Sequence, residues 1–170
     1  ALAALLLLTV GARSQAAALL FDFGGPESPS GVGGGGTTEF WNNLTASVAA
    51  SEGAEVPNLL TVTGEETAVV LQIVSRFNGA NESGTTSSGP YPVTGTRDSL
   101  FGNTELFSGL ENVTPIFKLY GLTPGSVHSF AFYASRLGAS DSRQTRYTVT
   151  GETSAFVDLE VSNNVTNVAR

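Results

Sequence analysis

His128 is the one histidine in the 170-residue chain, and the chain contains no cysteine. A metal centre built on two histidines is therefore excluded, and a Ser-His-acid triad would depend on this single ring. Neither the Gly-x-Ser-x-Gly motif of a serine nucleophile nor the Gly-Lys-Ser/Thr end of a phosphate-binding loop occurs. His128 follows Pro124 and Gly125, and we expect its ring to be buried at this corner, with one nitrogen bonded to the backbone. These residues predict a protein that is not an enzyme.

The acidic residues are scattered, and no two of them form a privileged pair of the kind that glycoside hydrolysis needs. Hard cations such as Ca²⁺ prefer oxygen ligands, and an exported protein without disulfides gains from a metal that holds its loops. The candidate ligands for a structural Ca²⁺ are Asp22, Asp98 and Asp141. The alternative is that these acids are solvated on the surface. No other cofactor is expected.

Trp41, the only tryptophan, precedes Asn42 and Asn43. This combination suits a carbohydrate site, because an aromatic ring stacks on the apolar face of a sugar while amides bond its hydroxyl groups. It also suits the end of a strand, where the tryptophan packs over the core. Both interpretations remain open from the sequence.

A second candidate ligand site combines Tyr133 and Tyr147 with Arg136 and Arg143. Guanidinium groups bind carboxylates in bidentate fashion, so the two arginines could bind an anion or a uronic acid. Asp141 lies between them in the sequence. The alternative is therefore a local ion pair that holds a hairpin turn.

The charge balance and the first residues indicate where the protein acts. Fifteen acidic and eight basic residues give a net charge of −7, and Lys118 is the only lysine, so nucleic acid is not an expected partner. Residues 1–10 form an apolar run too short to span a membrane, followed by small residues at the positions that a signal peptidase reads. We expect a signal peptide over residues 1–16, cleaved after Ala16 or Ala18, no membrane span in the mature chain, and bacterial export to the cell surface or the medium.

The remaining chain consists of about eight short extended runs separated by turn residues, without a helical period. Predicted strands lie at 18–23, 58–63, 67–77, 116–120, 127–136, 144–150 and 155–161. In the strongest of them, 127–136, alternation places His128, Phe130 and Phe132 on one face. The pattern predicts one antiparallel β-sandwich over residues 17–170, which lacks its last strands. The Gly-rich stretch 24–38 is predicted to be mobile, and 78–98 to be a functional or disordered loop.

Several segments resemble known proteins. GLTPGSVHSF at 121–130 resembles the corner between two strands of fibronectin type III domains, with His128 at the place of their corner tyrosine. LFDFG at 20–24, WNNLT at 41–45, RDSLFG at 97–102, FYASR at 132–136 and YTVTG at 147–151 resemble uncharacterised secreted bacterial β-sandwich proteins, many of which carry a C-terminal PEP-CTERM sorting signal. The LFDFG opening is also similar to the galactose-binding-like jelly rolls attached to secreted polysaccharide esterases and lyases. These resemblances imply a jelly-roll or fibronectin type III-like sandwich, and they supply no catalytic residue.

Together, these observations predict an exported, non-enzymatic module of the cell surface or extracellular matrix. Its expected partner is an extracellular glycan or another cell-surface component. The alternative is an accessory domain of a secreted polysaccharide-degrading enzyme whose catalytic domain lies outside this chain.

Overall fold

The computed structural model describes residues 17–25, 39–87 and 89–170. Their only helical segments are α1 (Ala46–Ala49) and the 3-10 helix η2 (Val93–Gly95), and the regular structure is otherwise strand. The predicted all-β class is confirmed. The predicted signal peptide and most of the Gly-rich stretch lie outside the described residues. Within the described residues, no helix is both long enough and apolar enough to cross a bilayer.

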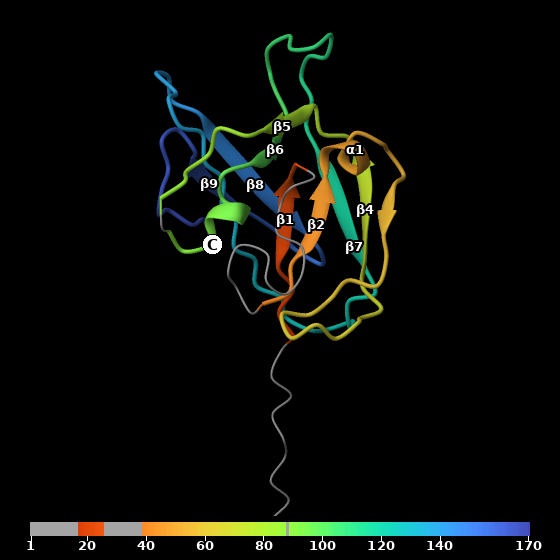
Figure 1. Ribbon diagram of the computed structural model, residues 1–170. Helices are drawn as coiled ribbons and strands as arrows, with labels where there is room; N and C mark the ends of the chain where they lie inside the picture. Colours follow the sequence, from red (N-terminus) through yellow and green to blue (C-terminus); the bar gives the residue numbers. More distant parts are fainter. Residues whose placement is uncertain (1–16, 26–38, 88) are drawn as a thin grey trace, which may run out of the picture.

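Two small sheets are formed by β1 (Phe21–Gly24) and β2 (Asn42–Thr45) and by β3 (Glu55–Val56), β4 (Val70–Ser75) and β7 (Ile116–Tyr120) (Figure 1). β1 and β2 pair in parallel, whereas β4 lies antiparallel between β3 and β7. The parallel pair corrects the expectation of antiparallel pairing throughout. A parallel return needs a connection of roughly a dozen residues or more, and the chain between β1 and β2 is long enough to provide it.

The main hydrophobic core lies where these two sheets meet. Leu44, Leu71 and Ile73 are each at most 1% exposed, and each such side chain contributes about 1.5–3 kcal/mol by its burial. On β4 the neighbouring Val74 points outward, as the two-residue period of a strand requires. Leu71 and Ile73, two residues apart, share the inward face of β4. Phe117 completes this core from β7.

A third sheet is the hairpin of β8 (Gln144–Thr150) and β9 (Ser154–Glu160), in which all seven residues of each strand are paired. β5 (Gly79–Asn81) and β6 (Ser99–Phe101) form a further antiparallel pair. In Figure 1, β8 and β9 lie on one side of the molecule, β4 and β7 lie on the other, and β1 and β2 lie between them.

Two predicted strands do not form. Residues 58–63 make one isolated bridge, and residues 127–136 make two, at Phe132 and Arg136, within the described chain. The ring of Phe132 stacks on Tyr147 of β8, so this part of the chain lies across the face of the hairpin. Its backbone is therefore not at a strand edge, where ladder hydrogen bonds could form.

The turn after β7 requires glycine at position 121. Gly121 has a φ of +78°, and a Cβ atom there would lie 2.3 Å from the carbonyl oxygen of Ala68. Both the left-handed backbone and the close approach to Ala68 exclude a side chain. This turn fixes the direction in which the chain leaves β7 toward residues 127–136.

Candidate functional site

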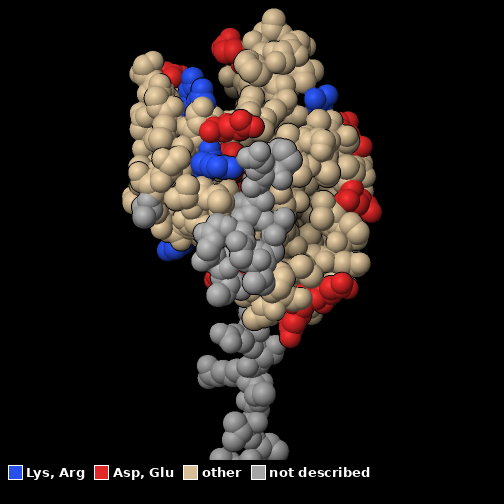
Figure 2. Space-filling view, in the orientation of Figure 1, with Lys and Arg blue, Asp and Glu red and all other residues tan. Residues whose placement is uncertain are grey.

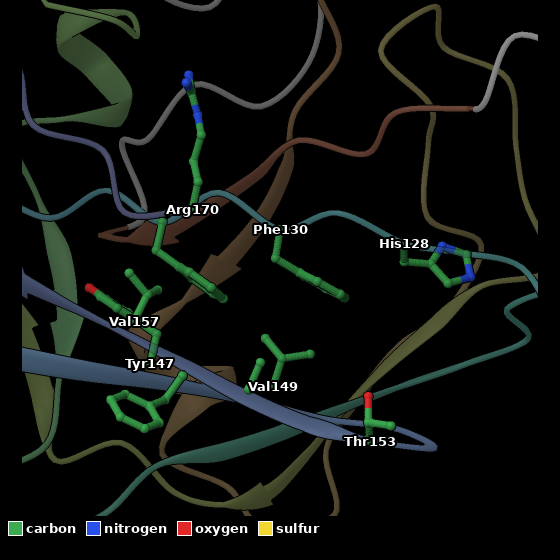
Figure 3. Close-up of a pocket in the computed structure, with 10 residues that line it drawn as sticks. His128, Phe130, Tyr147, Val149, Thr153, Val157 and Arg170 are labelled. Atoms are coloured by element: carbon green, nitrogen blue, oxygen red, sulfur yellow. The ribbon is translucent and has the colours of Figure 1, made fainter.

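A hollow lined by aromatic rings lies between residues 128–132 and the β8–β9 hairpin (Figure 3). It encloses about 280 Å³. Its lining consists of rings, aliphatic side chains and a few polar groups, namely His128, Phe130, Phe132, Tyr147, Val149, Thr153, Ala155, Phe156, Val157 and Arg170. We refer to this feature as the aromatic hollow.

Three of its rings are stacked in parallel. The ring centres of Phe132 and Tyr147 are 4.4 Å apart with 7° between their planes, and those of Phe130 and Phe132 are 6.3 Å apart with 8° between planes. Phe130 and Phe132 share one side of the chain because they are two residues apart in an extended segment. In Figure 3, open space separates Phe130 from His128, above Val149. One face of the Phe130 ring is therefore turned toward the hollow.

The polar groups of the hollow lie mainly at its rim. His128 is exposed, Thr153 lies in the turn between β8 and β9, and the guanidinium of Arg170 extends away from Val149 (Figure 3). Burial raises the pKa of Tyr147 to about 12, so that its phenol stays neutral at ordinary pH. The described lining includes no acidic side chain. The hollow is thus an apolar surface with hydrogen-bond donors and one cation around it.

His128 does not occupy the buried corner expected for it. The imidazole is exposed, and in the described part of the chain it makes no hydrogen bond to the backbone at Pro124 and Gly125. The reason is that residues 127–136 do not form the predicted strand. Without strand partners, the first residues of this segment are not held against a core. The expected common face of His128, Phe130 and Phe132 is confirmed, since all three line the hollow.

Trp41 and Asn42 are buried, and Asn43 is half-buried. Trp41 is 6% exposed and meets Tyr91 edge-on, with 6.1 Å between ring centres. Asn42 donates from Nδ2 to the carbonyl oxygens of Leu20 (3.0 Å) and Leu60 (2.8 Å), and its Oδ1 accepts from the Leu60 N–H at 2.8 Å. These contacts correct the prediction of an open sugar platform here, since no ring face is available and the Asn42 amide is fully used.

The two arginines of the second candidate site do not form a clamp. Arg143 pairs with Asp141 at 3.2 Å on the exposed turn before β8, whereas Arg136 donates to the Asn81 side chain. The predicted ion pair therefore forms with Arg143 alone.

The two tyrosines of that site make different contacts. The Tyr133 hydroxyl donates to the carbonyl oxygen of Val165 at 3.1 Å, and burial raises its pKa. Its ring packs edge-on against Tyr91. Of the seven residues predicted to bind a ligand, only Tyr147 lines the aromatic hollow.

The three aspartates predicted to bind Ca²⁺ are divided between two places. Asp22 and Asp98 are buried, at 2% and 7% exposure, and Asp98 accepts a 2.8 Å hydrogen bond from the N–H of Gly25, just after β1. Asp141 is exposed at the Arg143 turn. Among the described residues, no group of three or more His, Cys, Asp or Glu side chains is arranged to hold an ion. Ca²⁺ binding by Asp22, Asp98 and Asp141 stays a prediction.

Most residues of the hollow were not singled out from the sequence. The available signal was the alternation that aligns His128, Phe130 and Phe132, but this pattern is the same for a core face and for an open hollow. Thr153 and Arg170 carry no local signal, because they reach the hollow only through the hairpin turn and the return of the chain after β9.

Comparison with protein-family models, with curated proteins and with solved structures gives no match.

Proposed function

We propose that this protein is an exported, non-enzymatic module of the cell surface or extracellular matrix, and that it acts by binding a ligand in the aromatic hollow. The observation that carries the proposal is the stack of Phe130, Phe132 and Tyr147 beside an open volume of about 280 Å³. Concave apolar surfaces with a few polar groups are typical of ligand sites. Buried rings alone would support only packing, but this stack borders open space.

The lining defines the chemistry of the ligand. The open face of Phe130 suits an apolar or planar group, and His128, Thr153 and Arg170 offer donors at the rim. A ligand that fits is amphipathic, with an apolar face bordered by acceptor or anionic groups. The described residues of the lining include no carboxylate that would repel an anion at close range.

The proposal is tested with anilinonaphthalene sulfonate, a probe that combines aromatic rings with an anion. We expect saturable fluorescence enhancement with the wild-type protein, and a large loss in Phe130→Ser and in Ala155→Glu. Ala155 is exposed, so the second variant blocks the hollow without removing a ring. Ile116→Ser is the matched control, because Ile116 is 50% exposed on β7, outside the hollow. Equal binding by all four proteins would contradict the proposal.

Carbohydrate binding is a second candidate function, favoured by a ring face in a hollow whose rim carries the Thr153 hydroxyl and Arg170. In that role the module would hold a polysaccharide-degrading enzyme, or the cell surface itself, on its polymer. Affinity electrophoresis in neutral and uronic-acid polysaccharides tests this directly. Retardation of the wild-type protein that Phe130→Ser abolishes would support it, and unretarded migration in every polysaccharide would exclude those ligands.

A further inference from the structure

An apolar tip projects from the loop between β6 and β7. Leu106 is 70% exposed and Phe107 is 54% exposed. Phe107 and Leu110 exchange two backbone hydrogen bonds, and both residues between them, Ser108 and Gly109, have positive φ values. This is the geometry of a tight two-residue turn. The Phe107 ring packs edge-on against Phe101, with 5.6 Å between ring centres. The tip is therefore a defined shape that holds Leu106 out into solvent.

The tip has acidic residues on both sides. Glu105 precedes Leu106 and Glu111 follows Leu110, and neither has an ion pair among the described residues. The loop 102–115 contains no basic residue. In the space-filling view, the projection at the top of the molecule is uncharged with an acidic group at its side (Figure 2). The tip thus offers an apolar end between two negative charges.

The aromatic hollow is complementary to this tip in polarity, charge and size. It presents rings where the tip presents Leu106, and its described lining carries the positive charge of Arg170 and no acidic side chain. Arg170 has no ion pair among the described residues. An apolar cavity of about 150 Å³ is enough to hold a benzene ring, so the 280 Å³ of the hollow has room for a side chain of the tip.

One copy of the protein cannot bring its own tip to its own hollow. In Figure 1 the loop between β6 and β7 projects from the top of the molecule, whereas the turn that closes β8 and β9 lies in the lower half. A contact between a tip and a hollow therefore joins two copies through different surfaces. Each copy then keeps one free tip or hollow, and such head-to-tail contacts build chains or rings.

We infer that the partner of the aromatic hollow is the tip, residues 105–111, of a second copy of this protein. The inference rests on the proposed function in one respect, because it requires the hollow to be a binding site. Leu106 enters the hollow beside Phe130, and Glu105 and Glu111 lie near Arg170 at its rim. A protein with these properties assembles on itself, which suits a module of a surface layer or matrix.

The test is sedimentation velocity of the full chain over a range from micromolar to millimolar concentration. We expect the wild-type protein and the Ile116→Ser control to form species larger than dimers as concentration rises. Leu106→Glu in the tip and Ala155→Glu in the hollow should each weaken association about tenfold or more. Both positions are exposed, so both variants are expected to fold. Raising the salt concentration should weaken wild-type association, since charges at the rim contribute to it.

Mixing the two variants gives the decisive result. Leu106→Glu retains a hollow and Ala155→Glu retains a tip, so the mixture should form one-to-one dimers and nothing larger. A mixture that stays monomeric would overturn the head-to-tail arrangement, as would association of the wild-type protein that neither variant weakens.

The other outcomes separate this inference from the proposed function. A wild-type protein that stays monomeric but binds the fluorescent probe, with loss in Ala155→Glu, would refute self-association and leave the hollow as a binding site. A monomeric protein that is retarded by a polysaccharide through Phe130 would assign the hollow to a glycan instead. A monomeric protein without probe or polysaccharide binding would refute both proposals.

Discussion

Replacing Asn42 by alanine is expected to lower the free energy of unfolding by about 3 kcal/mol. Its side chain makes three hydrogen bonds of 2.8–3.0 Å to the backbone of Leu20 and Leu60, which joins the chain before β1 to β2 and to residue 60. Each intramolecular hydrogen bond contributes about 1 kcal/mol net. Asn42 is only 9% exposed, so water cannot readily replace these bonds in the variant.

Trp41 provides the assay. It is the only tryptophan, it is 6% exposed, and it precedes Asn42, so its fluorescence reports unfolding of this region. In urea, the curve for Asn42→Ala should shift to lower concentration with an unchanged slope. In a thermal scan, a loss of about 3 kcal/mol corresponds to a Tm lower by roughly 6–12 °C for a chain of this size.

The neighbouring asparagine supplies the control. The Oδ1 atom of Asn43 is buried without a hydrogen-bond partner, so Asn43→Ala removes an unpaired polar group and should cost less than about 1 kcal/mol. If both variants lost the same stability, or if Asn42→Ala lost less than about 1 kcal/mol, the role assigned to the three hydrogen bonds would be refuted.

Three further predictions concern other parts of the molecule. Gly121→Ala should cost more than about 2 kcal/mol in thermal unfolding, because strain adds to a backbone clash, whereas Gly125→Ala, with a similar φ of +75° and open space around it, should cost about 1 kcal/mol. Hydrogen bonds from Ser142, and then from Ser162 and Arg143, lower the pKa of Glu160 to about 2. The stabilising effect of the ionised Glu160 carboxylate is therefore complete above its ordinary pKa of 4.5 and is lost as pH falls through 2. A carboxyl titration by NMR should show a midpoint at about 2, and Ser142→Ala should raise that midpoint. Burial raises the pKa of Tyr147 from 10.0 to about 12, so the contribution of the neutral phenol to folding stability is complete below pH 10 and is lost as pH rises through 12. In an ultraviolet titration of the tyrosines, the step at the highest pH should disappear in Tyr147→Phe.

Alternation and turn residues predicted part of the fold well. The strands at 116–120 and 144–150 have the predicted bounds, and 67–77 contains β4. These runs are paired along their length, so their two-residue period reflects a real strand. Residues 127–136 show the same alternation, but they pack by their rings on the face of a hairpin. Alternation in a sequence shows which side of a segment is apolar. It does not show whether the backbone of that segment lies beside a strand with which it can pair.

The candidate sites could be predicted less well, because they depend on burial by distant segments. Trp41 is covered by Tyr91, about 50 residues later in the chain. His128 is exposed because no strand forms around it. Arg170 reaches the hollow because Phe132 and Ala169 form a bridge that brings the two segments together. None of these contacts can be predicted from the local sequence.

The pairing of β4 with β7 bears on the order of events during synthesis. β7 begins about 40 residues after β4 ends, so at a translation rate of about 5–20 residues per second β4 waits several seconds for its main partner. Until then only the two residues of β3 pair with β4. The other edge of β4, the strand that carries Leu71 and Ile73, has no partner, and an unpaired strand edge favours aggregation. The β8–β9 hairpin, whose strands are close in sequence, forms within microseconds once it is made. The vulnerable interval of this protein during synthesis therefore falls before β7 is made, and the late β8–β9 hairpin does not share it.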